Sequence, residues 1–179
     1  MEQEIDILIG DLKQRKASAC RQLLSDYGPT VLRMVSRIVT RLEDAEEVYQ
    51  DVFVKALHKI DTYDDSQATL ATWLSRIAYN ESLNFVRGKK PNIVYMDDRD
   101  TSIDTWEAPD DAPPDEQTIE QLEQALAMLP PHEQAIVSMF YYDNQSLADI
   151  AYVTGSIPST VGSQLCRIRK KLYRIIKTL

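Results

Sequence analysis

The sequence is poor in the residues that build disulfide frameworks, metal centres and tight turns. Its 179 residues include two cysteines, two histidines and five glycines. Cys20 and Cys166 lie far apart without metal-ligand spacing, and His58 and His132 join no cluster, so we interpret all four as structural or incidental. We therefore expect neither a metal nor a cofactor. So few glycines among many helix-forming residues predict an all-α fold.

Long apolar runs are absent as well. No segment approaches the roughly 20 apolar residues of a membrane-spanning helix, although 44% of the residues are hydrophobic. The chain begins with MEQEIDILIGDL, which is acidic and amphipathic, whereas a secretory signal has a basic start and a continuous apolar core. We expect a cytoplasmic protein without membrane insertion.

The net charge of −8 is concentrated in one short segment. Residues 1–90 hold 14 acidic and 13 basic side chains, residues 118–179 hold 5 and 6, and residues 91–117 hold 9 and 1. Local fields govern DNA binding, so the acidic total does not exclude it. The middle segment also contains four prolines and lacks periodicity. It predicts a flexible acidic linker, and a flexible arrangement of the two small helical domains that it joins.

Residues 146–171 show the pattern of a helix-turn-helix. Ser146 and Asp149 match a capping box, Gly155 can adopt the left-handed conformation that ends a helix, and Pro158 suits the first turn of the next one. The second helix has an apolar repeat at Val161, Leu165, Ile168 and Leu172.

The outward side chains of this second helix are small, polar or basic: Thr160, Ser163, Gln164 and Arg167. Such groups can hydrogen-bond base edges and phosphates in a major groove. The alternative is a helical hairpin with an ordinary solvated face, because short helix-turn-helix matches include false positives. The pattern favours DNA binding over that alternative.

The first ninety residues predict packed helices, with a helix boundary at Gly28–Pro29. Arg33, Arg37 and Arg41 then share one outer stripe, which could meet a polyanion but more often is a solvated face, the interpretation that we favour. The central helix is expected at residues 43–60 and starts with Glu43, Asp44, Glu46 and Glu47. Capping and solubility explain most of this charge, and a docking face or a carboxylate metal site are the alternatives.

The next helix is expected from about residue 68 to residue 87. One of its sides interleaves aromatic, amide and basic groups: Trp73, Arg76, Asn80, Asn84 and Arg87. A surface of this kind can stack an unpaired base and hold its backbone, although Trp73 by itself would more often be a core residue. Glu81 lies beside the apolar stripe, and nothing in the sequence explains its position.

Three motifs in this order resemble the bacterial sigma factors of the extracytoplasmic-function (ECF) group. They are DAEEVYQDVF at 44–53, TWLSRIAYN at 72–80, and LPPHEQAIVSMFYYDNQSLADIA together with TVGSQLCRIRKKL. The likeness covers nearly the whole chain. It implies a non-catalytic transcription initiation factor that binds core RNA polymerase and promoter DNA and opens the promoter. It also allows an anti-sigma protein as a further partner.

The resemblance implies a role for each surface. Domain 1–90 would bind polymerase and the minus-ten element, and domain 118–179 would bind the minus-thirty-five element as a duplex. The polymerase-docking residues would be Asp44, Glu47, Gln50 and Asp51. The loop 61–70 and the side chains of Trp73, Arg76, Asn80, Asn84 and Arg87 would capture a flipped base of the minus-ten element. The residues facing the minus-thirty-five groove would be Thr160, Ser163, Gln164 and Arg167.

The chain departs from the family pattern at Gly162 and Gln164, where basic residues are common. This lowers the phosphate affinity that we expect, and a glycine inside a helix costs about 1 kcal/mol relative to alanine. The main rival interpretation is a repressor or activator whose helix-turn-helix acts alone; binding of core polymerase by residues 1–90 separates the two. An enzyme with a metal site at residues 43–51 is less favoured, since no histidine ligand or nucleophile is suitably placed.

Overall fold

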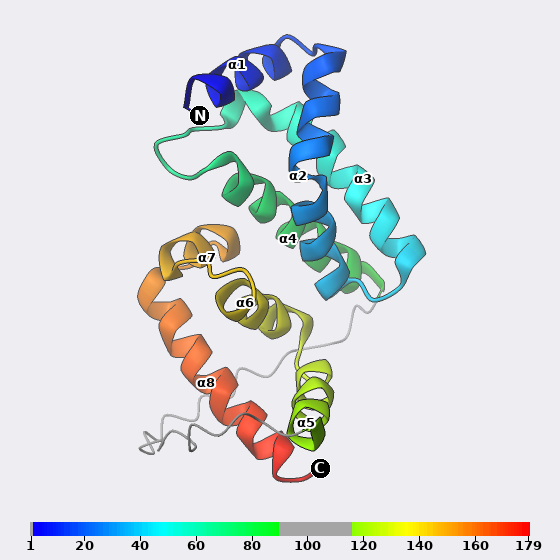
Figure 1. The fold of residues 1–179 in the computed structure, drawn as a ribbon, viewed down its shortest axis with the longest axis vertical. Coiled ribbons are helices and arrows are strands. Elements are labelled where there is room, and N and C mark those ends of the chain that lie inside the picture. The colour runs from blue at the N-terminus through cyan, green and yellow to red at the C-terminus, as the bar shows by residue number, and fades with distance from the viewer. Residues whose placement is uncertain (1, 90–115) are drawn as a thin grey trace.

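The computed structural model describes residues 2–89 and 116–179, and within these ranges the regular elements are all helices (Figure 1). The first range contains α1 (Glu2–Lys13), α2 (Ala17–Ile38), α3 (Leu42–Lys59), the 3-10 helix η1 (Ile60–Thr62) and α4 (Leu70–Lys89). The second contains α5 (Glu116–Ala127), α6 (Pro131–Tyr141), α7 (Leu147–Thr154) and α8 (Pro158–Ile176). The predicted all-α fold is confirmed. The predicted linker lies outside the described residues, apart from its last two, which begin α5.

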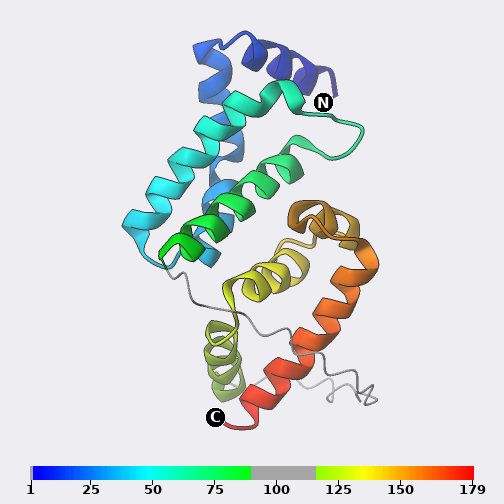
Figure 2. The ribbon, with the colours of Figure 1, turned by 180° about the vertical axis from the view of Figure 1, so that it is seen from behind.

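Helices α2, α3 and α4 form the core of the first domain, and α1 packs across the end of α2 (Figure 2). Apolar residues three and four positions apart place one face of each helix inward, for example Val31 and Val35 of α2 and Val48 and Val52 of α3. Leu74 of α4 is also fully buried between them. This three-helix core fixes the outward faces of α3 and α4, which carry the predicted site residues.

The expected helix boundary at Gly28–Pro29 is wrong, because α2 runs unbroken through both residues. Gly28 is buried against α3, and a Cβ built on it would lie 2.7 Å from the hydroxyl oxygen of Tyr49. Pro29 is exposed, while Leu23 and Val31 on either side are buried. Packing of this continuous apolar face against α3 and α4 holds the helix together across a residue that donates no backbone hydrogen bond.

The helix-turn-helix of the second domain is confirmed in its local chemistry. The Asp149 backbone N–H donates to Ser146 Oγ over 3.1 Å, which caps α7, and Gly155 ends α7 with a φ of 71°. Pro158 occupies the first turn of α8. The predicted inner face of α8 is buried at all four positions: Val161, Leu165, Ile168 and Leu172.

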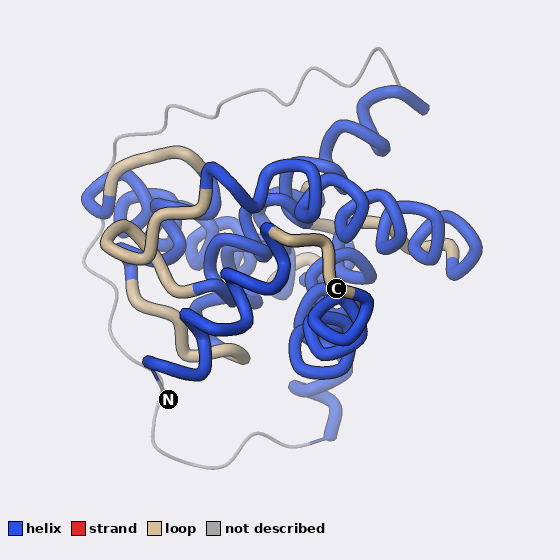
Figure 3. The backbone as a smooth tube through the Cα atoms, turned by 90° about the horizontal axis from the view of Figure 1, so that it is seen from above, coloured by secondary structure: helices blue, strands red, loops and turns tan. Residues whose placement is uncertain are grey.

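The two domains lie directly against one another, with α6 and α7 packed on α2 and α4. The view from above shows helices and short loops in the described chain and no strand (Figure 3). The composition of the linker predicted a flexible domain arrangement, whereas here the second domain covers part of the α2–α4 surface of the first. None of the helices in the two described ranges combines the length and apolar character needed to span a membrane.

Candidate functional site

The outward face of α3 carries an acidic ridge, formed by Glu47, Gln50 and Asp51. All three are exposed, on the side of the helix opposite the buried Val48 and Val52. These three residues belong to the set predicted to dock on polymerase, and the fold turns them toward solvent. The negative charge of this surface is complementary to a protein partner with a basic face.

The fourth predicted docking residue, Asp44, lies in a different environment. Its side chain is only 15% exposed, and Arg41 Nε stands 4.0 Å from its Oδ2. Arg41 also donates to Glu43 Oε2 over 3.1 Å. Glu43 and Asp44 thus form local ion pairs with Arg41, and both lie in the first turn of α3, where carboxylates complement the helix dipole. In the part of the chain that the structure describes, no group of three or more His, Cys, Asp or Glu side chains is placed to hold a metal ion.

Trp73 does not project from α4 with the polar side chains, contrary to the sequence-based expectation. It is 7% exposed and packs edge-on against Tyr63, with the ring centroids 5.5 Å apart. The buried arc of α4 is wider than a single stripe, because α2 and α3 cover one side and α7 packs on another. Trp73 therefore belongs to the core, where it supports the loop that contains Tyr63.

The other four members of the predicted minus-ten set are exposed on α4: Arg76, Asn80, Asn84 and Arg87. The Asn80 side chain donates from Nδ2 to the Arg76 carbonyl oxygen over 2.8 Å. The Arg76 guanidinium lies over the ring of Tyr152 in α7, 4.8 Å from its centroid. The second domain thus contacts a residue that the sequence assigned to DNA.

The loop before α4 is held by its own side chains. Asp64 accepts hydrogen bonds from Ser66 Oγ at 2.6 Å and from Gln67 Nε2 at 2.8 Å, and these bonds lower the pKa of its carboxyl group. Tyr63 donates its hydroxyl to the Ala68 carbonyl oxygen at 3.1 Å, and burial raises the pKa of its phenol. Thr69 Oγ1 then accepts from the N–H of Thr72 and caps α4. These hydrogen bonds hold the loop before α4 in one conformation beside the candidate site.

Glu81, whose position nothing in the sequence explains, pairs with Lys55. The two side chains join α4 to α3 at the edge of the core, where Glu81 is 20% exposed. An isolated acid beside an apolar stripe is thereby neutralised by a base on a neighbouring helix. Local sequence patterns carry no signal for this pair, since its members are 26 positions apart.

The four predicted minus-thirty-five residues differ in exposure along α8. Ser163 is exposed and donates to the Ser159 carbonyl oxygen over 3.0 Å, while Thr160, Gln164 and Arg167 are half-buried. The Oε1 atom of Gln164 is buried without a hydrogen-bond partner among the described residues. A Cβ built on Gly162 would meet only Leu147 Cδ1, at 3.8 Å. The crossing of α7 and α8 therefore does not require glycine at this position.

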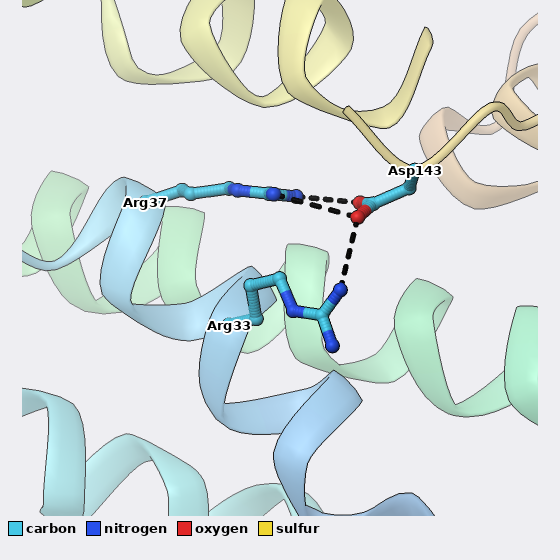
Figure 4. A network of polar contacts seen from close by, with 3 residues as sticks. All are labelled: Arg33, Arg37 and Asp143. Atoms are coloured by element: carbon cyan, nitrogen blue, oxygen red, sulfur yellow. Dashed lines mark hydrogen bonds and ion pairs between the residues drawn. The ribbon is translucent and has the colours of Figure 1, made fainter. Parts of the chain in front are cut away.

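Arg33 and Arg37, two of the three arginines predicted to share an outer stripe, lie on α2 and bind the second domain (Figure 4). Arg41 lies beyond α2, at the N-cap of α3. Arg37 Nη1 donates to Asp143 Oδ2 at 2.5 Å and Nη2 to Oδ1 at 3.4 Å, and Arg33 Nη1 donates to Oδ1 at 3.3 Å. The expectation of a solvated face is wrong for Arg37, whose side chain is only 20% exposed, whereas Arg33 remains 54% exposed although it is paired. Their partner follows more than a hundred residues later, so local sequence patterns could not reveal it.

His132 lies at the start of α6, at the opposite end of this helix from Asp143. Burial lowers the pKa of its imidazole, and the charges of Lys171 and Arg87 lower it further, while Glu133 opposes them. Lys171 donates to Glu133 Oε2 over 2.9 Å, which ties α8 to α6. Helix α4, which carries Arg87 near its end, contacts α6.

Family models match both halves of the chain. Residues 23–91 match the model described as Sigma-70 region 2, and residues 119–172 match Sigma-70, region 4. The first match begins within α2 and leaves out α1, and the second begins within α5 and ends within α8. The two matches include the acidic ridge on α3, the exposed face of α4 and most of α8.

Curated relatives are similar over nearly the full length. The ECF RNA polymerase sigma factor SigW of Bacillus subtilis is 24% identical over 189 residues, with all of both chains covered. The ECF RNA polymerase sigma factor RpoE of Cereibacter sphaeroides is 26% identical over 168 residues, which cover 90% of this chain and 86% of that one.

Two solved structures share the fold. CnrH in complex with the cytosolic domain of CnrY gives a TM-score of 0.65 at 19% identity, with 96% of each chain covered. The sigma factor RpoE of Bartonella quintana, in complex with the anti-sigma factor NepR, gives 0.62 at 22% identity, covering 88% of this chain and 96% of that one.

Proposed function

The chain belongs to the extracytoplasmic-function group of RNA polymerase sigma factors, and on this premise we propose which of its surfaces meets each partner. As a member of this group it binds core RNA polymerase and promoter DNA and directs promoter-specific transcription initiation. The proposal places polymerase binding and minus-ten recognition in residues 1–90 and minus-thirty-five recognition in residues 118–179.

The proposed polymerase-docking surface is the outward face of α3, with Asp44, Glu47, Gln50 and Asp51. The observation that carries this assignment is the exposure of Glu47, Gln50 and Asp51 on one side of a helix whose other side is buried. Asp44 contributes at the edge, where Arg41 holds its carboxylate in place. Complementary charge at such a surface speeds association and fixes the orientation of docking.

The proposed minus-ten surface is the exposed face of α4, with Arg76, Asn80, Asn84 and Arg87, together with the loop 61–70. Arginines hold the backbone of a single strand, and the amides hydrogen-bond an unpaired base. Trp73 acts here as a positioning residue, because its ring packs beneath Tyr63 at the start of the loop. The side-chain hydrogen bonds of Asp64 and Tyr63 prepare this loop before DNA arrives.

The proposed minus-thirty-five surface is the outward face of α8, with Thr160, Ser163, Gln164 and Arg167. The capped helix-turn-helix presents this face as a rigid unit. Gln164 is half-buried and its Oε1 atom is buried, so its amide would meet a base only after the side chain rotates outward.

We further propose that the protein lacks catalytic activity of its own, that it works in the cytoplasm beside polymerase and chromosome, and that an anti-sigma protein controls it. The last point is supported by the structural relative from Bartonella quintana, which was solved with an anti-sigma factor.

The experiment that tests the docking assignment measures retention of the full chain by immobilised bacterial core RNA polymerase. We expect Glu47→Lys with Asp51→Lys to abolish retention, because both acids become bases on the exposed ridge. The control is Glu120→Lys with Glu123→Lys on α5, which changes the net charge equally at exposed positions outside the ridge. Retention of the ridge variant at the wild-type level would overturn the docking assignment. Failure of the wild-type protein, where a known sigma factor binds, would overturn polymerase binding itself.

A further inference from the structure

The contact between the domains places one carboxylate on two arginines. Asp143, in the turn between α6 and α7, receives both terminal nitrogens of Arg37 and one of Arg33. The Asp143 and Arg37 side chains are 17% and 20% exposed, whereas Arg33 remains 54% exposed. Arg37 and Asp143 thus form a bidentate ion pair that is largely shielded from water, and the more exposed Arg33 also binds the Asp143 carboxylate.

The same interface engages an arginine of the proposed minus-ten surface. One helix away from the Asp143 pair, the Arg76 guanidinium lies 4.8 Å from the centre of the Tyr152 ring. Asp143 lies in the turn before α7 and Tyr152 lies within α7, so one short segment of the second domain supplies both contacts. The second domain offers these arginines a carboxylate and an aromatic ring.

A carboxylate resembles the phosphate of a nucleotide in its charge and its hydrogen-bond acceptors, and an aromatic ring resembles the base. A guanidinium fork binds carboxylate and phosphate with the same paired geometry. The flat face of a guanidinium stacks on aromatic rings and on bases alike. The side chains that now bind Asp143 and Tyr152 are therefore equipped to bind the phosphate and the base of a DNA strand.

We propose that Arg33 and Arg37 form a phosphate-binding site for single-stranded promoter DNA, and that Asp143 occupies this site while the two domains are closed. The inference rests on the proposed minus-ten function of α4 and extends that surface onto α2. Promoter DNA reaches the site only when the second domain moves away, so one carboxylate couples domain opening to DNA binding.

The arrangement of the arginines favours DNA over an acidic protein as the second occupant. Arg33 and Arg37 stand one helical turn apart, about 6 Å along α2, and Arg76 lies on α4, which packs against α2. All three face the second domain. A polyanion whose charges recur along a flexible strand can meet several of these groups at once, next to the amides that would contact its bases.

The test uses the full chain, a fluorescein-labelled oligothymidylate strand and fluorescence anisotropy over a series of salt concentrations. This probe measures binding to the backbone without knowledge of the promoter. Asp143→Ala is expected to bind the strand several-fold more tightly than the wild-type protein. Adding Arg33→Ala and Arg37→Ala is expected to abolish the gain and to reduce the slope of log K against log salt by about 0.7 for each phosphate that the protein no longer binds.

Matched controls separate the site from a general charge effect. Glu123→Ala removes one negative charge at an exposed position of α5, and Arg21→Ala removes one positive charge at the other end of α2. Both are expected to bind like the wild-type protein. Asp143 and the two arginines lie in the contact between the domains and outside the hydrophobic core, so the variants are expected to fold. Circular dichroism of every variant checks that the helices are intact.

Three results would overturn the proposal. Asp143→Ala could bind the strand no better than Glu123→Ala does, or its gain could persist without Arg33 and Arg37. The variant could instead gain affinity for polyglutamate alone, which would identify an acidic protein as the occupant. Retention by core polymerase, measured on the same variants, tests the proposed polymerase binding separately. The proposed phosphate-binding site can therefore be refuted without refuting the polymerase-docking surface.

Discussion

The guanidinium carbon of Arg76 lies over the ring of Tyr152 across the two domains, 4.8 Å from the ring centroid. Such a cation–π contact contributes about 0.5 to 2 kcal/mol, depending on how far water is excluded. We predict that Tyr152→Leu, which keeps an apolar side chain but removes the π face, shifts the protein toward more open conformations. Small-angle X-ray scattering should then give a larger radius of gyration.

The control for that change is Tyr173→Leu. Lys177 Nζ lies 4.5 Å from the Tyr173 ring, but both residues belong to the C-terminal end of the second domain. This variant should keep the wild-type radius of gyration. An equal expansion in both variants would contradict a specific role for the interdomain contact.

Arg167 is the residue of α8 whose loss should cost the most sequence specificity. If the Arg167 guanidinium makes a bidentate contact with a guanine, Arg167→Ala should weaken binding to the preferred duplex by about 1 to 3 kcal/mol. The variant should then lose its preference for guanine at that one base pair and keep its preferences elsewhere. The measurement compares holoenzyme affinity for duplexes selected from a random pool. Arg169→Ala, at an exposed position two residues on, should lower affinity for all sequences alike, if at all. An unchanged preference in Arg167→Ala would refute the assignment.

Gly162→Ala should stabilise the second domain by about 1 kcal/mol, because alanine is the better helix former and its Cβ would meet only Leu147 Cδ1 at 3.8 Å. The midpoint of urea unfolding reports the change. The opposite result is expected for Gly155→Ala, because Gly155 ends α7 with a φ of 71° and alanine is strained there. A lower midpoint in Gly162→Ala would show that α7 and α8 cannot accommodate even one methyl group.

Gly28→Ala should destabilise the first domain by about 1 to 3 kcal/mol, the usual cost of overpacking. Its Cβ would lie 2.7 Å from Tyr49 Oη, but 3.8 Å from Tyr49 Cζ. Removing the hydroxyl therefore removes the clash, and the double variant Gly28→Ala, Tyr49→Phe should be more stable than expected from the sum of the single changes. Additive unfolding free energies would contradict this close approach.

His132 should make the folded state sensitive to mild acid. Its pKa is lowered in the folded protein by burial, whereas in the unfolded chain it stays near 6.5. Below that value the unfolded state binds more protons, so the contribution to stability is present above pH 6.5 and is lost as the pH falls toward the folded pKa. Between about pH 7 and pH 5.5, the urea midpoint of the wild-type protein should fall more steeply than that of His132→Gln. Parallel pH profiles would show that His132 does not contribute.

Features that depend on neighbouring residues in the chain were predictable. The cap at Ser146, the left-handed turn at Gly155 and the start of α8 at Pro158 follow from backbone chemistry within a few residues. The buried face of α8 follows from a 3.6-residue period. The exposed acidic ridge on α3 was predictable for the same reason, since the position of its apolar stripe determines which side faces solvent.

Features that depend on residues distant in sequence were decided by the tertiary structure. Helix α2 continues through Gly28 and Pro29 because α3 and α4 pack along it, and Trp73 is buried because α4 is covered on more than one side. Arg33 and Arg37 bind Asp143, which the sequence places far downstream in the other domain. The sequence determined the helices and their buried stripes through local chemistry and periodicity. Which surfaces remain open to polymerase and DNA was decided by packing between distant segments, since burial and ion pairing depend on what lies nearby in space.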